Sequence, residues 1–286
     1  MDAAPHIPAL LAALSLAGFE AGTLTPFDDA GRGGGSKRWT ALSDTGFVVR
    51  CADTGDDRIQ PAETELDWAL RFAEHVKVQR PLLAVPIRFE SWTATVWEHV
   101  VASGEVTGAH AFEHGQVLRR LHDRVSLRGD ERFAANDQLS AARRRIDQLC
   151  SVDRSTAHVL RTYLTDAETF LEAEGELPNV ALHGDSLNHN LLSTTDGLVL
   201  IDFDSSSPGP STVDLATGLL SYRHHLRDEG AVAQFFAGYG PLSFDQRVLD
   251  RVVWVKRFRQ ACTHAARGDD IASRLDELDS LRAILT

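Results

Sequence analysis

The spacing of apolar residues changes about a third of the way along the chain. In the first part, two β-rich runs within Lys37–Cys51 flank a turn at 44–46, a pattern that predicts a β-hairpin. The segment 62–76 places its apolar residues on one helical face, and short strands are expected over 82–89 and 94–100. The first part of the chain is therefore expected to be rich in β-structure.

Beyond Gly104 the apolar residues recur mostly at the spacing of amphipathic helices. An exception is the stretch 182–204, where two short apolar runs look like buried strands. The pattern predicts an α+β protein with a small β-rich N-terminal lobe over 1–100, a hinge near Trp97–Val101, and a larger, mainly helical C-terminal lobe over 101–286. Helices are expected near 109–124, 138–150, 154–174, 213–228 and 244–267, followed by a short last helix.

The composition is typical of a globular protein, with 43% hydrophobic and 24% charged residues. A net charge of −12 argues against nucleic acid as a partner, because phosphate contacts need a clustered basic face. The three cysteines form no CxxC pair, which favours free thiols in a reducing cytoplasm. The apolar segment Ile7–Gly18 lacks a basic region before it and is interpreted as a helix, and no run reaches the roughly 18 apolar residues that span a bilayer. We expect a cytoplasmic protein without membrane contact, and the sequence leaves its oligomeric state open.

Acidic and amide side chains gather around the two strand-like runs of 182–204, whose sequence is LHGDSLNHNLLSTTDGLVLIDFD. Asp185 and Asn190 are separated by four residues, and Asp202 ends the apolar run LVLID. A carboxylate and an amide in one loop can hold a hydroxyl group and a metal ion together, and an aspartate at a strand end can complete a Mg²⁺ site with phosphate oxygens. This pattern indicates phosphoryl transfer, which requires charge neutralisation and an oriented attacking oxygen.

The motifs HGDSLNHN, LIDFD and PSTVDLATG together resemble the aminoglycoside phosphotransferase and choline-kinase-like family. The pattern of that family is H-G-D-x4-N, then an apolar strand ending in Asp, then D-L-A, and the clear match covers 180–220. The resemblance implies a two-lobed protein-kinase-like fold. It also implies a Mg²⁺-dependent kinase that transfers a phosphoryl group from ATP or GTP to the hydroxyl group of a small molecule.

The resemblance further implies a role for each matching residue of the C-terminal lobe. Asp185 would be the catalytic residue that accepts or orients the proton of the acceptor hydroxyl group. Asn190 and Asp202 would bind Mg²⁺ on the nucleotide phosphates. His183 and Asp214 would support the site, His183 by holding the loop and Asp214 by bracing that loop from the start of a helix.

Some of these assignments have competitors in the sequence. Asn188 competes with Asn190, although Asn190 directly precedes the apolar pair that the family pattern requires. Asp204 is expected either near the metal or in solvent. Asp214, in the first turn of a helix, would favour the helix dipole whatever the function of the protein.

The N-terminal lobe matches the family less well. The segment GRGGGSKRW, over Gly31–Trp39, can bring backbone N–H groups close to phosphates, so Gly33, Gly34 and Ser36 are candidates for nucleotide binding. The segment is not a Walker A motif, because the Gly-Lys-Ser/Thr triplet is missing at the required spacing. A flexible turn is the alternative interpretation.

The next strand should carry a lysine that pairs with the phosphates and with a glutamate of the following helix, and this chain has Arg50 there. An arginine keeps the charge and can bind two phosphate oxygens, but its geometry differs from that of lysine. Glu65 is the expected acidic partner, with Glu63 as the alternative, and an ion pair without functional consequence is also possible. The hinge is expected to contact the nucleotide base through Glu98, His99 and Val100.

The favoured interpretation is a small-molecule kinase. One alternative is a catalytically weak or inactive nucleotide-binding regulatory protein on the same fold, and another is a metal-dependent hydrolase that uses His183 together with Asp185 and Asp202. Residues 204–286 carry 10 basic and 11 acidic side chains, and the segment 221–230 contains Arg223, His224, His225 and Arg227. This balance favours a sugar, amino sugar or hydroxylated metabolite as acceptor over a polycationic antibiotic.

Overall fold

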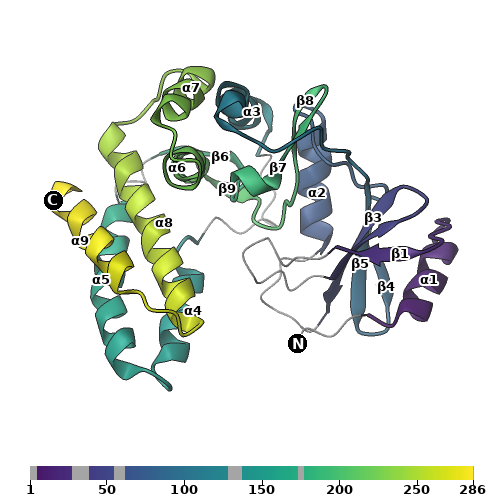
Figure 1. The fold of residues 1–286 in the computed structure, drawn as a ribbon, viewed down its shortest axis with the longest axis horizontal. Helices are drawn as coiled ribbons and strands as arrows, with labels where there is room; N and C mark the ends of the chain where they lie inside the picture. The colour runs from purple at the N-terminus through teal and green to yellow at the C-terminus, as the bar shows by residue number, and fades with distance from the viewer. Residues whose placement is uncertain (1–4, 28–38, 55–61, 128–136, 173–176, 286) are drawn as a thin grey trace.

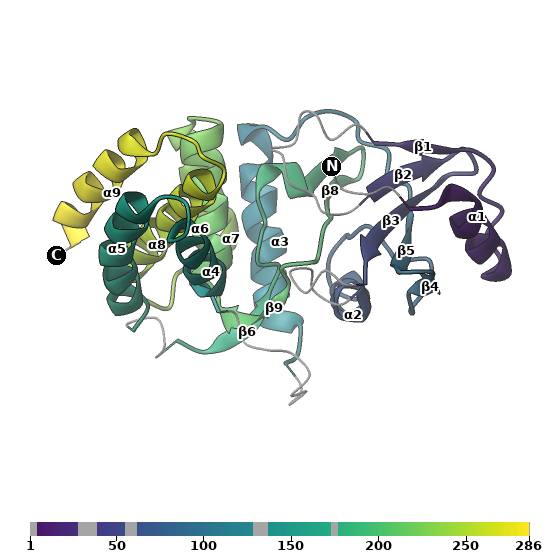
Figure 2. The same cartoon turned by 90° about the horizontal axis from the view of Figure 1, so that it is seen from below.

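The structure, a computed structural model, describes residues 5–27, 39–54, 62–127, 137–172 and 177–285. It has an α+β fold with two lobes, as the sequence predicts: a sheet with two helices lies at one end of the molecule and a group of helices at the other (Figure 1). Seen from below, α3 stands between the sheet and the remaining helices of the C-terminal lobe (Figure 2). None of the described helices combines the length and the apolar character that crossing a bilayer requires.

The N-terminal lobe is an antiparallel five-stranded sheet with the strand order β1-β2-β3-β5-β4. The predicted hairpin is formed by β2 and β3, in the register Ala41 opposite Val49. The elements are α1 (Ile7–Leu16), β1 (Leu24–Pro26), β2 (Trp39–Ser43), β3 (Phe47–Asp53), α2 (Ala62–Ala73), β4 (Ile87–Phe89) and β5 (Trp92–Glu98).

The two faces of β3 are covered by different layers, because successive side chains of a strand point to opposite sides. Phe47, Val49 and Cys51 pack in the cluster that contains Leu10 of α1. Val48 instead packs in the cluster that contains the apolar residues of α2. Helices α1 and α2 therefore bury opposite faces of the sheet.

The C-terminal lobe consists mainly of helices around two short two-stranded sheets, β6 with β9 and β7 with β8. Its elements are η2 (Gly108–His110), α3 (Ala111–Arg124), α4 (Ser140–Leu149), α5 (Arg154–Glu172), β6 (Asn179–Leu182), η3 (Asn188–Asn190), β7 (Leu191–Thr194), β8 (Gly197–Leu200), β9 (Ser207–Pro210), α6 (Thr212–Leu220), the π-helix η4 (Ser221–His225), α7 (Glu229–Tyr239), α8 (Gln246–Ala266) and α9 (Ala272–Leu285).

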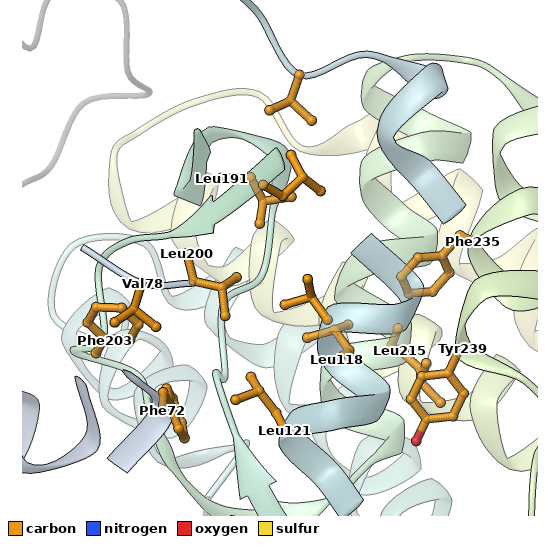
Figure 3. Packing of buried hydrophobic residues seen from close by; sticks show 14 of the residues in the cluster. Phe72, Val78, Leu118, Leu121, Leu191, Leu200, Phe203, Leu215, Phe235 and Tyr239 are labelled. Atoms are coloured by element: carbon orange, nitrogen blue, oxygen red, sulfur yellow. The ribbon is translucent and has the colours of Figure 1, made fainter. Parts of the chain in front are cut away.

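One hydrophobic cluster connects the two lobes (Figure 3). Phe72 of α2 and Val78 pack with Leu200 of β8, with Phe203, and with Leu118 of α3. Because this cluster includes residues from both sides of the hinge, the segments that follow β6 and β8 are fixed relative to the sheet as well as to the helices. The division of the chain at residue 100 stays a prediction.

The structure corrects the helix predicted over 213–228. The α-helix α6 ends at Leu220, a π-helical turn follows, and Arg227 has a positive φ of 53°. Asp228 then begins α7, which the sequence analysis did not predict, by accepting a hydrogen bond from the backbone N–H of Ala231 at 2.9 Å. An aspartate at this position is a common helix N-cap, so Asp228 marks the start of a new helix. The strand expected over 82–89 is also shorter and covers only Ile87–Phe89.

Candidate active site

The loop between β6 and β7 brings Asp185 and Asn190 into contact. The side-chain N–H of Asn190 donates hydrogen bonds to the backbone oxygen of Asp185 at 2.8 Å and to its carboxylate oxygen Oδ2 at 3.1 Å. Asn190 is buried, whereas Asp185 is half-buried. The competing amide, Asn188, donates its backbone N–H to the hydroxyl of Ser221 at 2.8 Å, so it connects the loop to η4. The loop is thus held by a contact between two of its own residues and by a contact with η4, while Asp185 is only half-buried.

Asp202 lies beside this loop, two residues after β8. The preceding residue, Ile201, donates its backbone N–H to the backbone oxygen of Asn190 at 3.0 Å. Asp202 itself has a positive φ of 65°, a conformation that is uncommon outside glycine and is found where the surrounding structure enforces it. Within the described residues its carboxylate makes no hydrogen bond, and the side chain is half-buried. Its charge is therefore available to a ligand.

The residues beside the Asp185 loop are suited to a hard cation. The amide nitrogen of Asn190 is directed at Asp185, which leaves the amide oxygen as a ligand for a metal ion. A carboxylate and an amide oxygen, completed by phosphate oxygens and water, are the ligands that Mg²⁺ prefers. No group of three or more His, Cys, Asp or Glu side chains occurs among the described residues in a metal-binding arrangement. A binding site here would therefore depend on oxygens from a bound nucleotide.

Asp214, in the first turn of α6, supports the start of the Asp185 loop through hydrogen bonds. This fully buried carboxylate accepts hydrogen bonds from the backbone N–H of His183 at 2.9 Å, from that of Gly184 at 2.8 Å, and from Nε2 of His122 at 3.1 Å. Burial by itself raises the pKa of Asp214, but the hydrogen bond and charge of His122 and the other donors outweigh burial, so the pKa is lowered. The ionised form is thus favoured where Asp214 contacts the loop.

His183 is fully buried and uses both ring nitrogens within the protein. Nε2 donates to the backbone oxygen of Ile201 at 3.0 Å, and Nδ1 accepts from the backbone N–H of Asp185 at 3.4 Å. The ring therefore connects the Asp185 loop to the strand end that carries Asp202. A histidine engaged in this way has no free nitrogen for a metal, which argues against the hydrolase interpretation.

Phe203 anchors the segment that carries Asp202. Its fully buried ring packs against Phe72 of α2 with ring centroids 5.9 Å apart, against Trp97 of β5 at 6.1 Å, and against His183 at 5.5 Å. Residue 203 thus links the C-terminal loop to a helix and a strand of the other lobe. Asp204, the next residue, is half-buried, and its Oδ1 accepts a hydrogen bond from the Ser205 hydroxyl at 3.1 Å.

In the N-terminal lobe, Arg50 of β3 is paired with Glu65 of α2. Nη1 of Arg50 lies 3.1 Å from Oε1 of Glu65, Nη2 donates to Oε1 of Gln79 at 2.9 Å, and the guanidinium lies 5.0 Å from the centre of the Trp97 ring. The alternative acid, Glu63, is instead 2.6 Å from Arg88. The Arg50 guanidinium is therefore held in a fixed position, and its bonds to described residues use two of its five N–H groups.

The hinge residues differ in what their backbones already bind. The N–H of Glu98 donates to the backbone oxygen of Arg80 at 2.9 Å, and its carbonyl accepts from Nε2 of Gln79 at 2.9 Å. The backbones of His99 and Val100 make no hydrogen bond with any described residue. Of the three predicted hinge contacts, these two are the better placed to bind a nucleotide base.

Other predicted residues lie outside this centre. Arg223 is paired with Glu229 at 2.8 Å on the surface, and the side chain of Arg257 contacts His224. The three phosphate-binding candidates of the glycine segment fall outside the described residues: Gly33, Gly34 and Ser36.

Sequence reasoning missed two residues that organise the site. His122, on α3, supports Asp214 and lies with Nδ1 2.9 Å from the hydroxyl of Tyr239. Gln79 joins Arg50 to the hinge, and its backbone N–H also donates to the oxygen of Leu200 at 2.8 Å. Neither stands in a recognisable motif, and only their three-dimensional partners reveal them.

Residues 32–252 match the phosphotransferase enzyme family. No curated protein sequence matches the chain. Among solved structures, the chain is similar to a choline kinase from Streptococcus pneumoniae, at 14% identity and a TM-score of 0.70, covering 98% of this chain and 99% of that one.

Two further structures have a similar fold. A microcompartment-associated aminopropanol kinase is 18% identical with a TM-score of 0.68, covering 96% of this chain and 95% of that one. A spectinomycin phosphotransferase, solved with ADP and spectinomycin, is 15% identical with a TM-score of 0.62, covering 96% and 93%. At these identities, the likeness concerns the fold.

The geometry of Gly184 generates a stability prediction. Gly184 has a φ of +86°, and a Cβ there would lie 2.0 Å from the backbone oxygen of Ser205, whereas at Gly46, with a φ of +93°, a Cβ would meet nothing within 4 Å. Gly46→Ala should cost about 1–2 kcal/mol in the free energy of unfolding, from the positive φ alone. Gly184→Ala should cost about 3–5 kcal/mol, because a collision with immobile backbone is added. Equal losses in urea-induced unfolding of the two variants would contradict the close approach of the loop to Ser205.

Proposed function

Because the chain belongs to the phosphotransferase enzyme family, we propose that it is a Mg²⁺-dependent kinase that transfers the γ-phosphoryl group of ATP or GTP to a hydroxyl group of a small molecule. The observation that supports this most strongly is the 3.1 Å contact between Asn190 and the Asp185 carboxylate, next to Asp202, whose carboxylate has no hydrogen-bond partner among the described residues. A base for a hydroxyl proton and oxygen ligands for a phosphate-bound cation are thereby adjacent.

In this reaction the acceptor oxygen attacks the γ-phosphorus as the bond to the β–γ bridging oxygen breaks, and a nucleoside diphosphate leaves. The hydroxyl proton passes to the carboxylate of Asp185. Asn190 orients that carboxylate through its amide N–H, and His183 accepts the backbone N–H of the same residue, so the base is held in place before the acceptor arrives. Mg²⁺, when bound through Asp202 and the Asn190 oxygen, supplies charge neutralisation for the phosphates.

The N-terminal lobe would bind the nucleotide. Arg50 is directed by Glu65 and Gln79, and its remaining N–H groups can donate to phosphate oxygens. The backbone groups of His99 and Val100, which bind no described residue, would bind the base. Gln79 connects these two functions, because it contacts both Arg50 and the hinge carbonyl of Glu98.

The acceptor proposed for this site is a hydroxylated molecule of low positive charge, such as a sugar, an amino sugar or a related metabolite. The near-neutral balance of 10 basic and 11 acidic residues over 204–286 supports this choice. The related structures include kinases named for choline, aminopropanol and spectinomycin, so the family accommodates different acceptors on one fold.

A second candidate function is nucleotide binding without turnover, in a regulatory protein of the same fold. The observation that favours it is Arg50 in the place of the usual lysine, with two of its N–H groups already bound inside the protein. Measured transfer of phosphate from radiolabelled ATP to a panel of hydroxyl compounds separates the two functions, since the regulatory protein would bind nucleotide but release no phosphorylated product.

Asp185→Asn should lower kcat by about 10²-fold or more while leaving nucleotide affinity near that of the wild type, because proton acceptance is lost and the shape of the side chain is kept. Steady-state kinetics with nucleotide titration measures both effects. Asp196→Asn, the same substitution at an exposed turn between β7 and β8, is the matched control and should leave kcat unchanged. An Asp185→Asn variant with more than about a tenth of the wild-type kcat would remove Asp185 from the role of base.

Asp202→Ala should abolish the tightening of nucleotide binding by Mg²⁺, because a carboxylate ligand of the ion is removed. Titration calorimetry with a non-hydrolysable ATP analogue, with and without Mg²⁺, measures this dependence. Asp204→Ala is the comparison variant and should keep the dependence. Loss of the dependence in Asp204→Ala alone would assign the metal to Asp204.

Arg50→Ala should raise the KM for the nucleotide about tenfold or more, because a charge-assisted contact to phosphate is lost, whereas Arg50→Lys should keep part of the affinity. Initial rates over a range of nucleotide concentrations test both. Arg88→Ala removes an exposed arginine of the same sheet and should be without effect. Wild-type kinetics in both Arg50 variants would exclude Arg50 from nucleotide binding.

A further inference from the structure

Two arginines meet where α4 packs against α8 in the C-terminal lobe. Arg145 lies on α4 and Arg259 on α8, and the two helices lie side by side in the structure (Figure 1). Both side chains are half-buried, and each is close enough to the other for their like charges to interact. The charge of Asp185, the proposed catalytic base, also acts on Arg259. Arg259 is therefore within electrostatic range of the carboxylate that would accept the proton of the acceptor.

Neither arginine has a partner among the residues that the structure describes. Arg145 and Arg259 make no hydrogen bond or ion pair there, and Nε of Arg259 is buried without an acceptor. Neighbouring arginines on the same two helices are paired: Arg143 lies 3.0 Å from Glu168, and Arg257 lies 2.7 Å from Glu277. Within the described part of the chain, Arg145 and Arg259 are thus half-buried without the carboxylate contact that Arg143 and Arg257 have.

The carboxylates that act on Arg259, those of Asp137 and Asp185, have hydrogen-bond partners other than this arginine. Asp137 accepts the backbone N–H groups of Leu139 and Ser140 at 3.0 Å each, and it lies 3.5 Å from Arg143. Asp185 accepts from Asn190 and forms no ion pair with Arg259. The two acidic residues influence Arg259 from a distance and form no ion pair with it among the described residues.

An unpaired guanidinium that is partly removed from water is unfavourable. Burial lowers the pKa of Arg259, and the charge of Asp185 offsets part of that effect, while burial also lowers the pKa of Arg145. Two such groups together increase the cost, since like charges repel. A planar guanidinium pair with free N–H groups is a strong site for a carboxylate or a phosphate, which it can bind through two parallel hydrogen bonds.

We propose that Arg145 and Arg259 form an anion-binding subsite of the acceptor pocket, and that the acceptor carries a carboxylate or phosphate group in addition to the hydroxyl group that is phosphorylated. This inference rests on the proposed kinase function. The proposed function requires only an acceptor of low positive charge. The subsite adds an anionic group, and it predicts hydroxy acids or phosphorylated polyols as substrates. The arginines bind and position the acceptor, while Asp185 accepts its proton.

Matched acceptor pairs test the inference by activity. One pair is 4-hydroxybutyrate and its amide, and the other is glycerol 3-phosphate and glycerol, so that carboxylate and phosphate are examined separately. The wild type should use the anionic member of at least one pair with a kcat/KM at least tenfold higher. Arg259→Gln should reduce that preference at least tenfold through KM, and Arg259→Lys should restore part of it. Hydrolysis of the nucleotide without acceptor should stay within twofold of the wild type.

Arg247→Gln is the matched control, because it removes the same charge from an exposed position in the first turn of α8. It should leave the preference between paired acceptors unchanged. If Arg247→Gln and Arg259→Gln lost the preference for the anionic acceptor to the same extent, the subsite would be overturned, since both effects would then reflect only the net charge of the protein. A fall in kcat of similar size for anionic and neutral acceptors in Arg259→Gln would also overturn it, because the arginine would then serve the transferred phosphoryl group.

A measurement without turnover separates failure of the subsite from failure of the proposed function. Inorganic phosphate at millimolar concentration should raise the Tm of the wild type and of Arg247→Gln, but not that of Arg259→Gln or Arg145→Gln. Without phosphate, Arg259→Gln should have an unchanged or higher Tm, because an unpaired buried charge is removed. A lower Tm, or an equal response to phosphate in all four proteins, would overturn the inference. Absence of nucleotide binding with an intact phosphate response would instead refute the kinase proposal alone.

Discussion

The buried carboxylate of Asp214 is the constraint on which the site depends. It sits in the first turn of α6, and its hydrogen bonds to the backbone of His183 and Gly184 fix the direction in which the chain leaves β6. A fully buried carboxylate is costly unless its lone pairs are satisfied, and His122 supplies the remaining donor from α3. Three elements that are distant in sequence thus converge on one charged group, and the orientation of Asp185 follows from that convergence.

The neighbouring Asp202 is held in its unusual conformation from both sides. Before it, Ile201 is hydrogen-bonded to Asn190, and after it, Phe203 is buried between α2, β5 and His183. A positive φ at a non-glycine residue is retained where surrounding contacts determine it, and such residues concentrate at functional sites. Because Phe203 also packs on the N-terminal lobe, movement between the lobes would be transmitted to Asp202.

The short-range spacing of a motif was enough to select Asp185 and Asn190 as candidates in one loop, but it did not predict the hydrogen bond between their side chains. The α+β fold could be predicted from a different signal, because the spacing of apolar residues changes sharply between the two lobes. Partners brought together by tertiary packing, such as His122 with Asp214 or Gln79 with Arg50, have no sequence signal. Helix α7 was not predicted either; it begins at the Asp228 N-cap, a residue that the sequence analysis placed at the end of the preceding helix.

The overall charge of −12 and a cationic acceptor subsite are compatible, because the two act over different distances. At physiological ionic strength, interactions between exposed charges are screened beyond about 8 Å, so the net charge of the protein has little influence inside a partly buried site. The charges that act on Arg259 include those of Asp185, Arg145 and Asp137. When a nucleotide and Mg²⁺ are bound, the Asp185 side would attract the hydroxyl proton while the arginines bind the anionic group. An acceptor that carries both groups would then be oriented at two points, which a cationic acceptor of the same size could not achieve at this position.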